Sequence, residues 1–95
     1  MSGYKIDQQL SDVGEHIRGW RMVLGLTAQQ VAERAGITRS TVHKIEAGDS
    51  GVRWGSVAQV LRALGILDKA VEATDPLSSD IGRLRADRLT KRRAQ

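Results

Sequence analysis

The sequence contains no cysteine, no phenylalanine and a single proline, and its only aromatic residues are two tryptophans and one tyrosine. Without cysteine, disulfides, thiolate catalysis and cysteine-ligated metals are excluded, which is compatible with a reducing compartment. A chain of 95 residues can bury one modest core, and here aliphatic side chains must fill it. We therefore expect an all-α protein in which short helices pack on one another.

Long apolar segments are also missing. No apolar run approaches the roughly 18 residues that a membrane span requires, and the N-terminus lacks the charged-then-apolar order of a signal peptide. We therefore expect a cytoplasmic protein with no membrane partner.

The sequence contains few residues in patterns typical of catalytic or metal-binding sites. The sequence shows no nucleophile beside a base, no carboxylate pair and no phosphate-binding glycine loop. His16 and His43 lie far apart and lack the spacing of a metal-binding helix. We expect no enzyme activity, no catalytic residue, no metal and no cofactor.

The positive charge is concentrated at the C-terminus. The formal net charge is +4; residues 1–76 carry nine basic and nine acidic side chains, whereas residues 77–95 carry six and two. An excess of positive charge favours an anionic partner. The globular part, although neutral overall, can still bind DNA if its basic residues share one face.

Helical spacing predicts where the folded part begins. Residues 1–10 show no sustained period, and we expect a loose arm there. A first helix is predicted to begin at Ser11 or Asp12 and to end at Gly25. Its apolar positions are Val13, Ile17, Trp20, Val23 and Leu24.

Capping signals predict the next two helices. Thr27 followed by Gln30 has the capping-box spacing and opens a helix over residues 28–35. Gly36 allows a tight turn, and Thr38 can cap a third helix over residues 39–47.

Two more helices complete the predicted domain, which spans residues 11–74. A fourth helix runs from Trp54 to Gly65 and a short fifth one covers residues 67–73. The Asp75-Pro76 pair then interrupts the helical pattern. The basic tail, residues 75–95, is expected to be a marginal helix or disordered. Trp20 and Trp54 are assigned to the core or to a subunit interface.

The informative segment is the pair of short helices joined by the Gly36 turn. Such a unit places its second helix in a major groove. Helical spacing turns one set of residues inward: Val31, Ala32, Ala35, Ile37, Val42 and Ile45. The same spacing leaves donor-rich side chains on the outer face of the second helix: Arg39, Ser40, His43 and Lys44.

These residues resemble the Cro and phage-repressor type of helix-turn-helix family over about 55 to 60 residues. The resemblance is carried by Arg21, Leu26-Thr27, Val31-Ala32, Ala35-Gly36, Arg39-Ser40-Thr41, Ile45-Glu46 and Ala63-Leu64-Gly65. It implies a lambda-repressor-like bundle of four to five helices. It also implies an ion pair between Arg21 and Glu46.

The resemblance further implies which residues contact DNA bases and which contact the DNA backbone. Arg39, Ser40 and Lys44 fall on positions that meet base edges, and His43 lies beside them. Contacts to the DNA backbone are expected from four residues: Gln29, Thr38, Thr41 and Arg53. Where many members have Gln after the helix-opening Thr, this chain has Ala28, followed by Gln29.

The expected function is a sequence-specific, autoregulatory transcriptional repressor that binds a palindromic operator as a homodimer. The expected dimer surface consists of the fifth helix, Trp54 and the segment after it. The basic tail is similar to tails of antitoxins that neutralise a HipA-like kinase toxin, and the toxin would bind there. Alternatives are a phage or plasmid repressor, a restriction-modification controller protein, and a protein-interaction module that uses the bundle only as a scaffold.

Overall fold

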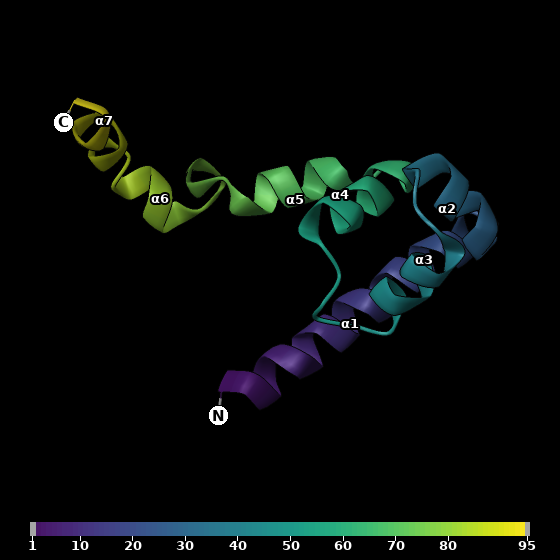
Figure 1. The fold of residues 1–95 in the computed structure, drawn as a ribbon. Helices are drawn as coiled ribbons and strands as arrows, with labels where there is room; N and C mark the ends of the chain where they lie inside the picture. The colour runs from purple at the N-terminus through teal and green to yellow at the C-terminus, as the bar shows by residue number, and fades with distance from the viewer. Residues whose placement is uncertain (1, 95) are drawn as a thin grey trace.

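The computed structural model describes the backbone of residues 2–94 and the side chains of residues 5–90, and this part contains helices and no strand. The all-α prediction is therefore confirmed. Figure 1 shows a bundle of α1 to α4 from which α5 and the C-terminal elements extend. In chain order the elements are α1 (Ser2–Val23), α2 (Ala28–Ala35), α3 (Arg39–Glu46), α4 (Trp54–Ala63), α5 (Leu67–Thr74), the 3-10 turn η1 (Pro76–Ser78), α6 (Asp80–Leu84) and α7 (Asp87–Ala94).

The core lies where α1 to α4 meet. Helix α2 packs on α3 and α4, and α1 packs on α3. The buried apolar side chains are Ile17, Ala28, Val31, Ala32, Ala35, Val42, Ile45, Val60 and Leu64. The inward set predicted for α2 and α3 is confirmed, with Ile37 partly buried against the same cluster.

Local capping fixes where α2 and α3 begin. Thr27 Oγ1 accepts a hydrogen bond from the Gln30 amide at 3.0 Å, and Gln30 Oε1 accepts one from the Thr27 amide at 2.8 Å. This is the predicted capping box. Gly36 ends α2 in the left-handed region at φ +70°, so a residue without a Cβ suits the turn. Thr38 Oγ1 then accepts from the Thr41 amide at 3.1 Å and caps α3.

Helix α1 differs from its prediction at its start. Residues 2–10 are helical, so the predicted loose arm and the helix start at Ser11 or Asp12 are wrong; Met1 lies outside the described residues. No proline or glycine interrupts residues 5–10, and Gln8 Nε2 donates to Asp12 Oδ1 at 3.0 Å across the predicted boundary. Side-chain pairs four residues apart stabilise a continuous helix.

The buried face of α1 also differs from its prediction. Ile17 and Gly14 are buried, with Leu10 and Arg21 partly buried on the same face. The apolar residues assigned to the first helix are instead exposed, with the exception of Ile17: Val13, Trp20, Val23 and Leu24. Trp20 and Trp54 remain 45% and 66% exposed, so their placement in the core is wrong, while a subunit interface stays a prediction.

The C-terminal elements are helical and lie outside the core. Helix α5 ends at Thr74, one residue later than predicted, and η1, α6 and α7 follow. Helices α5 and α6 and the turn η1 contain no buried residue. The tail was predicted to be either a marginal helix or disordered, and the structure shows it as helical. Gln95 lies outside the described residues.

Gly14 allows α1 and α3 to cross at close range. A Cβ at Gly14 would lie 2.8 Å from the Ile45 carbonyl oxygen and nearer still to that of Glu46. Both neighbours are backbone atoms at the end of α3, so they cannot rotate away as a side chain does. Gly19, five residues later in α1, has nothing within 4 Å of the corresponding position.

We predict opposite effects of alanine at these two glycines. Gly14→Ala lowers the free energy of unfolding by about 1 to 3 kcal/mol, because α1 and α3 must separate. Gly19→Ala raises it by about 0.5 to 1 kcal/mol, because alanine is the better helix former and has space there. Urea unfolding followed by circular dichroism measures both, and a stabilising Gly14→Ala would contradict the close crossing.

Candidate nucleic-acid interface

The outer face of α3 is formed by four exposed polar side chains. Arg39, Ser40, His43 and Lys44 are exposed, whereas Val42 and Ile45 on the opposite side are buried. At about 100° per residue, the four span roughly 140° around the helix. The structure therefore brings together on one surface all four residues that were expected to reach base edges, and contact with DNA stays a prediction.

Thr38 and Thr41 form a small hydroxyl pair at the start of α3. Their Oγ1 atoms lie 2.9 Å apart, and Thr38 Oγ1 also accepts from the Thr41 amide. Two hydroxyl groups carry two protons, and their mutual hydrogen bond uses one. The other proton remains for an acceptor such as a phosphate oxygen.

Arg53, directly before α4, joins this region from a different part of the chain. It is exposed and precedes α4, and it lines a hollow of about 410 Å³ together with Thr41 and Lys44. Asp49 lines the hollow too, with its Oδ1 accepting from the Gly51 amide at 2.7 Å. The fold thus collects two cations and a hydroxyl at one edge of α3.

The start of α4 at Trp54 was predicted, but its contribution to this hollow was not. Arg53 occupies the N-cap position and, within the described part of the chain, makes no side-chain capping hydrogen bond. Ser56, in the first turn of α4, lines the same hollow. The positive end of the helix dipole therefore faces the hollow and adds to its preference for an anion. The available sequence signal was Arg53 directly before Trp54, at the position where a capping Ser, Thr, Asp or Asn is usual.

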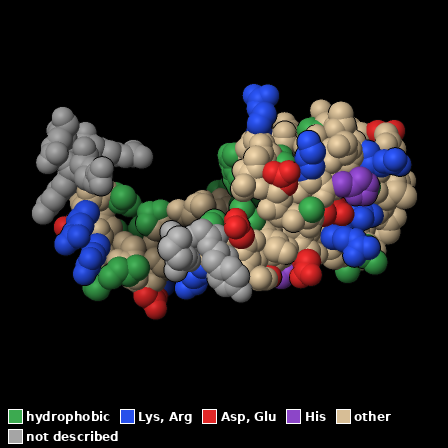
Figure 2. Space-filling view, turned by 60° about the horizontal axis from the view of Figure 1, so that its bottom comes forward, with side chains coloured by type: hydrophobic (Ala, Val, Ile, Leu, Met, Phe, Trp, Pro, Cys, Tyr) green, Lys and Arg blue, Asp and Glu red, His purple; other side chains and the backbone are tan. Residues whose placement is uncertain are grey.

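Gln29 lies apart from this hollow, at the first turn of α2. It is exposed, and its Nε2 donates to Glu33 Oε2 at 3.2 Å. The amide group has a second N–H, so Gln29 retains one donor beyond this contact. Figure 2 shows Lys, Arg and His side chains grouped at the end of the molecule that carries α2 and α3.

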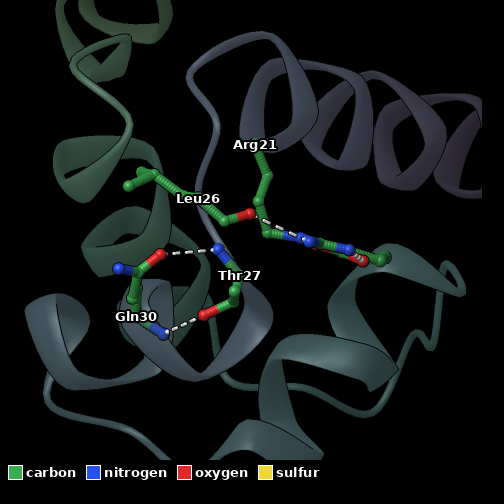
Figure 3. Close-up of polar contacts among 5 residues, drawn as sticks. Arg21, Leu26, Thr27 and Gln30 are labelled. Atoms are coloured by element: carbon green, nitrogen blue, oxygen red, sulfur yellow. Dashed lines mark hydrogen bonds and ion pairs between the residues drawn. The ribbon is translucent and has the colours of Figure 1, made fainter.

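Arg21 sets the position of α3 relative to α1 and α2. Its Nε lies 2.7 Å from Glu46 Oε2, and its Nη2 donates to Glu46 Oε1 at 3.1 Å. Its Nη1 donates to the Leu26 carbonyl oxygen at 3.1 Å, directly before the Thr27 capping box (Figure 3). The pair implied by the family resemblance is present, and the Leu26 contact is additional.

This pair is shielded from water. The side chains of Arg21 and Glu46 are 14% and 6% exposed. The hydrogen bond to Glu46 raises the pKa of the Arg21 guanidinium above its ordinary value, against a smaller opposite effect of burial. A basic group whose pKa is higher in the folded protein than in the unfolded chain stabilises the fold at pH values below its unfolded pKa. The contribution of Arg21 is therefore complete at neutral pH and is lost only in strong alkali.

We predict that Glu46→Ala lowers the free energy of unfolding by about 3 to 5 kcal/mol, because it leaves the Arg21 charge buried without a partner. Thermal and urea unfolding measure the change. Asp80→Ala is the matched control, since it removes an ion pair with Arg83 that is exposed on the surface, and it should leave the bundle's unfolding unchanged. A Glu46→Ala protein as stable as its parent that has lost DNA binding would contradict the structural role.

No helix among residues 2–94 is long and apolar enough to cross a membrane. In the same part of the chain, no three His, Asp or Glu side chains gather in a way that could hold a metal ion.

Comparison with known proteins gives one match. The model of a family described as a helix-turn-helix domain matches residues 12–74, which include α2, α3, α4 and α5 and the C-terminal half of α1. No curated protein and no solved structure matches the chain. The matched region contains every residue of the outer face of α3 and the Arg21–Glu46 pair. The chain belongs to the helix-turn-helix domain family, of the Cro and C1 type, and is a DNA-binding regulator.

Proposed function

We propose that this protein is a sequence-specific transcriptional repressor in which α3 enters the major groove of operator DNA. The observation that carries the proposal is the pattern on α3: apolar residues hold one side in the core, and four polar side chains stand free on the other. A helix fits the major groove, where each base pair presents its own set of donors and acceptors.

The side chains of the outer face have distinct roles in this proposal. Arg39 and Lys44 are of the residue types that bind guanine O6 and N7, whereas Ser40 and His43 can each pair with several base edges. Phosphate contacts come from the edge of α3 and the start of α4, through Thr38, Thr41 and Arg53, and from Gln29 on α2. Such contacts fix the register of α3 along the groove but do not distinguish sequences.

We further propose that the protein acts as a homodimer on a palindromic operator in its own promoter. One α3 reads only a few base pairs, and two-fold symmetry doubles that number. The two α3 helices would lie about 34 Å apart, in successive major grooves on one side of the DNA.

A second candidate role is that of an antitoxin that neutralises a HipA-like kinase toxin. The observation that favours it is a set of exposed apolar side chains beside arginines in the C-terminal elements, a composition suited to a protein contact: Leu77, Ile81, Leu84, Arg85 and Arg88. Lys91, Arg92 and Arg93, which add charge to the tail, have side chains outside the described residues.

Promoter binding tests the assignment of base contacts. Arg39→Ala and Lys44→Ala should each weaken binding to the protein's own promoter by about 10- to 100-fold, because each removes a base contact of roughly 1 to 3 kcal/mol. Their melting temperatures should not change, since both side chains are exposed. Lys69→Ala on α5 removes the same charge away from α3 and should bind like the parent. Equal, weak binding to promoter and scrambled DNA by the parent protein would favour the interaction module instead.

Salt dependence tests the assignment of phosphate contacts. Arg53→Ala should weaken binding to promoter and scrambled DNA alike and reduce the slope of log affinity against log salt by about 0.9, the value for one phosphate contact. Arg39→Ala should instead reduce the preference for promoter over scrambled DNA. If Arg53→Ala changes this preference and leaves the slope unchanged, Arg53 contacts a base or no DNA at all.

A further inference from the structure

One face of α1 is apolar and has no partner within the described chain. Ile6, Val13 and Trp20 recur every seven residues, which aligns them along the helix, and Val23 follows one turn later. Their exposed fractions are 49%, 49%, 45% and 78%. We call these four residues the outer stripe of α1. The contact of α1 with α3 uses a different face, formed around Gly14 and Ile17.

A shallow, open hollow of about 360 Å³ adjoins the outer stripe at Trp20 and Val23, and its other lining residues are Glu15, His16 and Gly19. Gly19 contributes to it because no atom lies within 4 Å of the place where its Cβ would be. A glycine inside a helix destabilises that helix relative to alanine, and no internal packing requires one here. The hollow is therefore suited to receive a side chain from another molecule.

The segment from Asp75 to Arg83 has a shape fixed by polar contacts. Ser78 Oγ lies 2.7 Å from the carbonyl oxygens of Glu72 and Asp75, which ties η1 to α5. Arg83 pairs with Asp80 and donates from Nη1 to the Leu77 carbonyl oxygen at 3.0 Å. A Cβ at Gly82 would collide with the Pro76 carbonyl oxygen, so α6 packs directly on η1.

This segment is ordered without burying apolar side chains. Leu77, Ile81 and Leu84 are 46%, 56% and 78% exposed. Figure 2 shows hydrophobic side chains next to Lys and Arg side chains on this part of the molecule, at the left. We call Leu77, Ile81 and Leu84, with the adjacent Arg85 and Arg88, the tail patch.

The tail patch and the outer stripe are complementary in charge. Arg85 and Arg88 are exposed and follow the apolar residues of the tail patch along the chain, with Asp87 between them. Glu15 lines the hollow of the outer stripe, and Asp12 lies one turn before it. Of the basic residues near Trp20, Arg21 is paired with Glu46 on the side facing α3, and Arg18 points about 160° away from Trp20 around the helix. An apolar side chain of the tail patch in the hollow would thus lie between arginines of its own chain and the acidic residues Asp12 and Glu15 of α1.

Within one chain the two surfaces are kept apart. The radius of gyration is 16.2 Å, against about 12 Å for a compact domain of this length, because the C-terminal elements extend from the bundle (Figure 1). Only Asp75 separates α5 from η1, and Ser78 holds η1 on α5. These contacts hold the tail patch on α5 and away from its own α1, which leaves it exposed to a partner from another chain.

From these observations we infer that the tail patch of one copy docks on the outer stripe of α1 of a second copy, with a leucine in the hollow beside Gly19. Two-fold symmetry makes this contact twice in each dimer, which helps small surfaces reach the roughly 1,200 Å² that stable interfaces bury. This inference rests on the homodimer of the proposed function and places its interface on α1 and the tail, not on α5 and Trp54.

Cross-linking between chains tests the docking directly, since the natural chain contains no cysteine. Val23→Cys and Leu84→Cys proteins are mixed and treated with a short bismaleimide. We expect abundant cross-linking between the two different variants. The control is a mixture of Val23→Cys with Ser50→Cys, a position exposed in the loop before α4, which should give little product. Equal yields from the two mixtures would overturn the inference.

Sedimentation equilibrium measures the effect on the dimer. Leu84→Asp and Gly19→Leu should each raise the dimer dissociation constant at least tenfold while circular dichroism stays helical. Joint reversal of Asp12 and Glu15 to Arg should weaken the dimer as well, and adding Arg85→Glu and Arg88→Glu should restore it. Val71→Asp on α5, another exposed apolar position, should have little effect.

The outcomes separate this inference from the proposed function. A dimer that binds the promoter and is dissociated by Val71→Asp, but not by Leu84→Asp, overturns the docking and leaves the repressor proposal intact. A monomer whose tail patch contacts only a different protein also overturns it. A protein that is monomeric and shows no preference for its promoter contradicts both.

Discussion

One guanidinium group holds the three helices of the DNA-binding unit together. Arg21 on α1 binds both carboxylate oxygens of Glu46 at the end of α3 and the carbonyl oxygen of Leu26 just before α2. The outer face of α3 can be presented in a defined orientation only if α3 is fixed at both ends. Thr38 caps its start, Arg21 holds its last residue, and the close crossing at Gly14 leaves little freedom between them. The buried charge pair therefore fixes the orientation of α3, and it adds to the apolar core that the three helices share.

The sequence was most informative where structure is local. The capping residues Thr27, Gln30 and Thr38 and the turn at Gly36 act within a few positions of the chain, and the second and third helices were predicted from them nearly residue by residue. The inward and outward faces of those helices followed from periodicity, since each helix has only one apolar side. The Arg21–Glu46 pair is long-range, and it was expected only because the family resemblance relates the two positions.

Prediction failed where the packing partner, not the periodicity, decides which face is buried. On α1 the apolar positions suggested a face containing Val13 and Trp20, but the face that meets α3 contains Gly14, whose missing side chain permits the approach. A periodicity of apolar residues cannot identify a contact made by a glycine. Likewise, η1 and α6 are held by side-chain contacts to backbone carbonyls, such as those of Ser78 and Arg83, which apolar patterns do not reveal. The hollow around Arg53 combines residues from two helices and needed the fold to be seen.

The central claim is that the outer face of α3 reads bases from the major groove. Methylation interference on the protein's own promoter tests it most directly, because guanine N7 lies in the major groove and adenine N3 in the minor groove. The account predicts that N7 methylation blocks binding at guanines in two clusters about one helical turn apart, one for each α3 of a dimer. Interference confined to adenine N3, or none at any base, would contradict it.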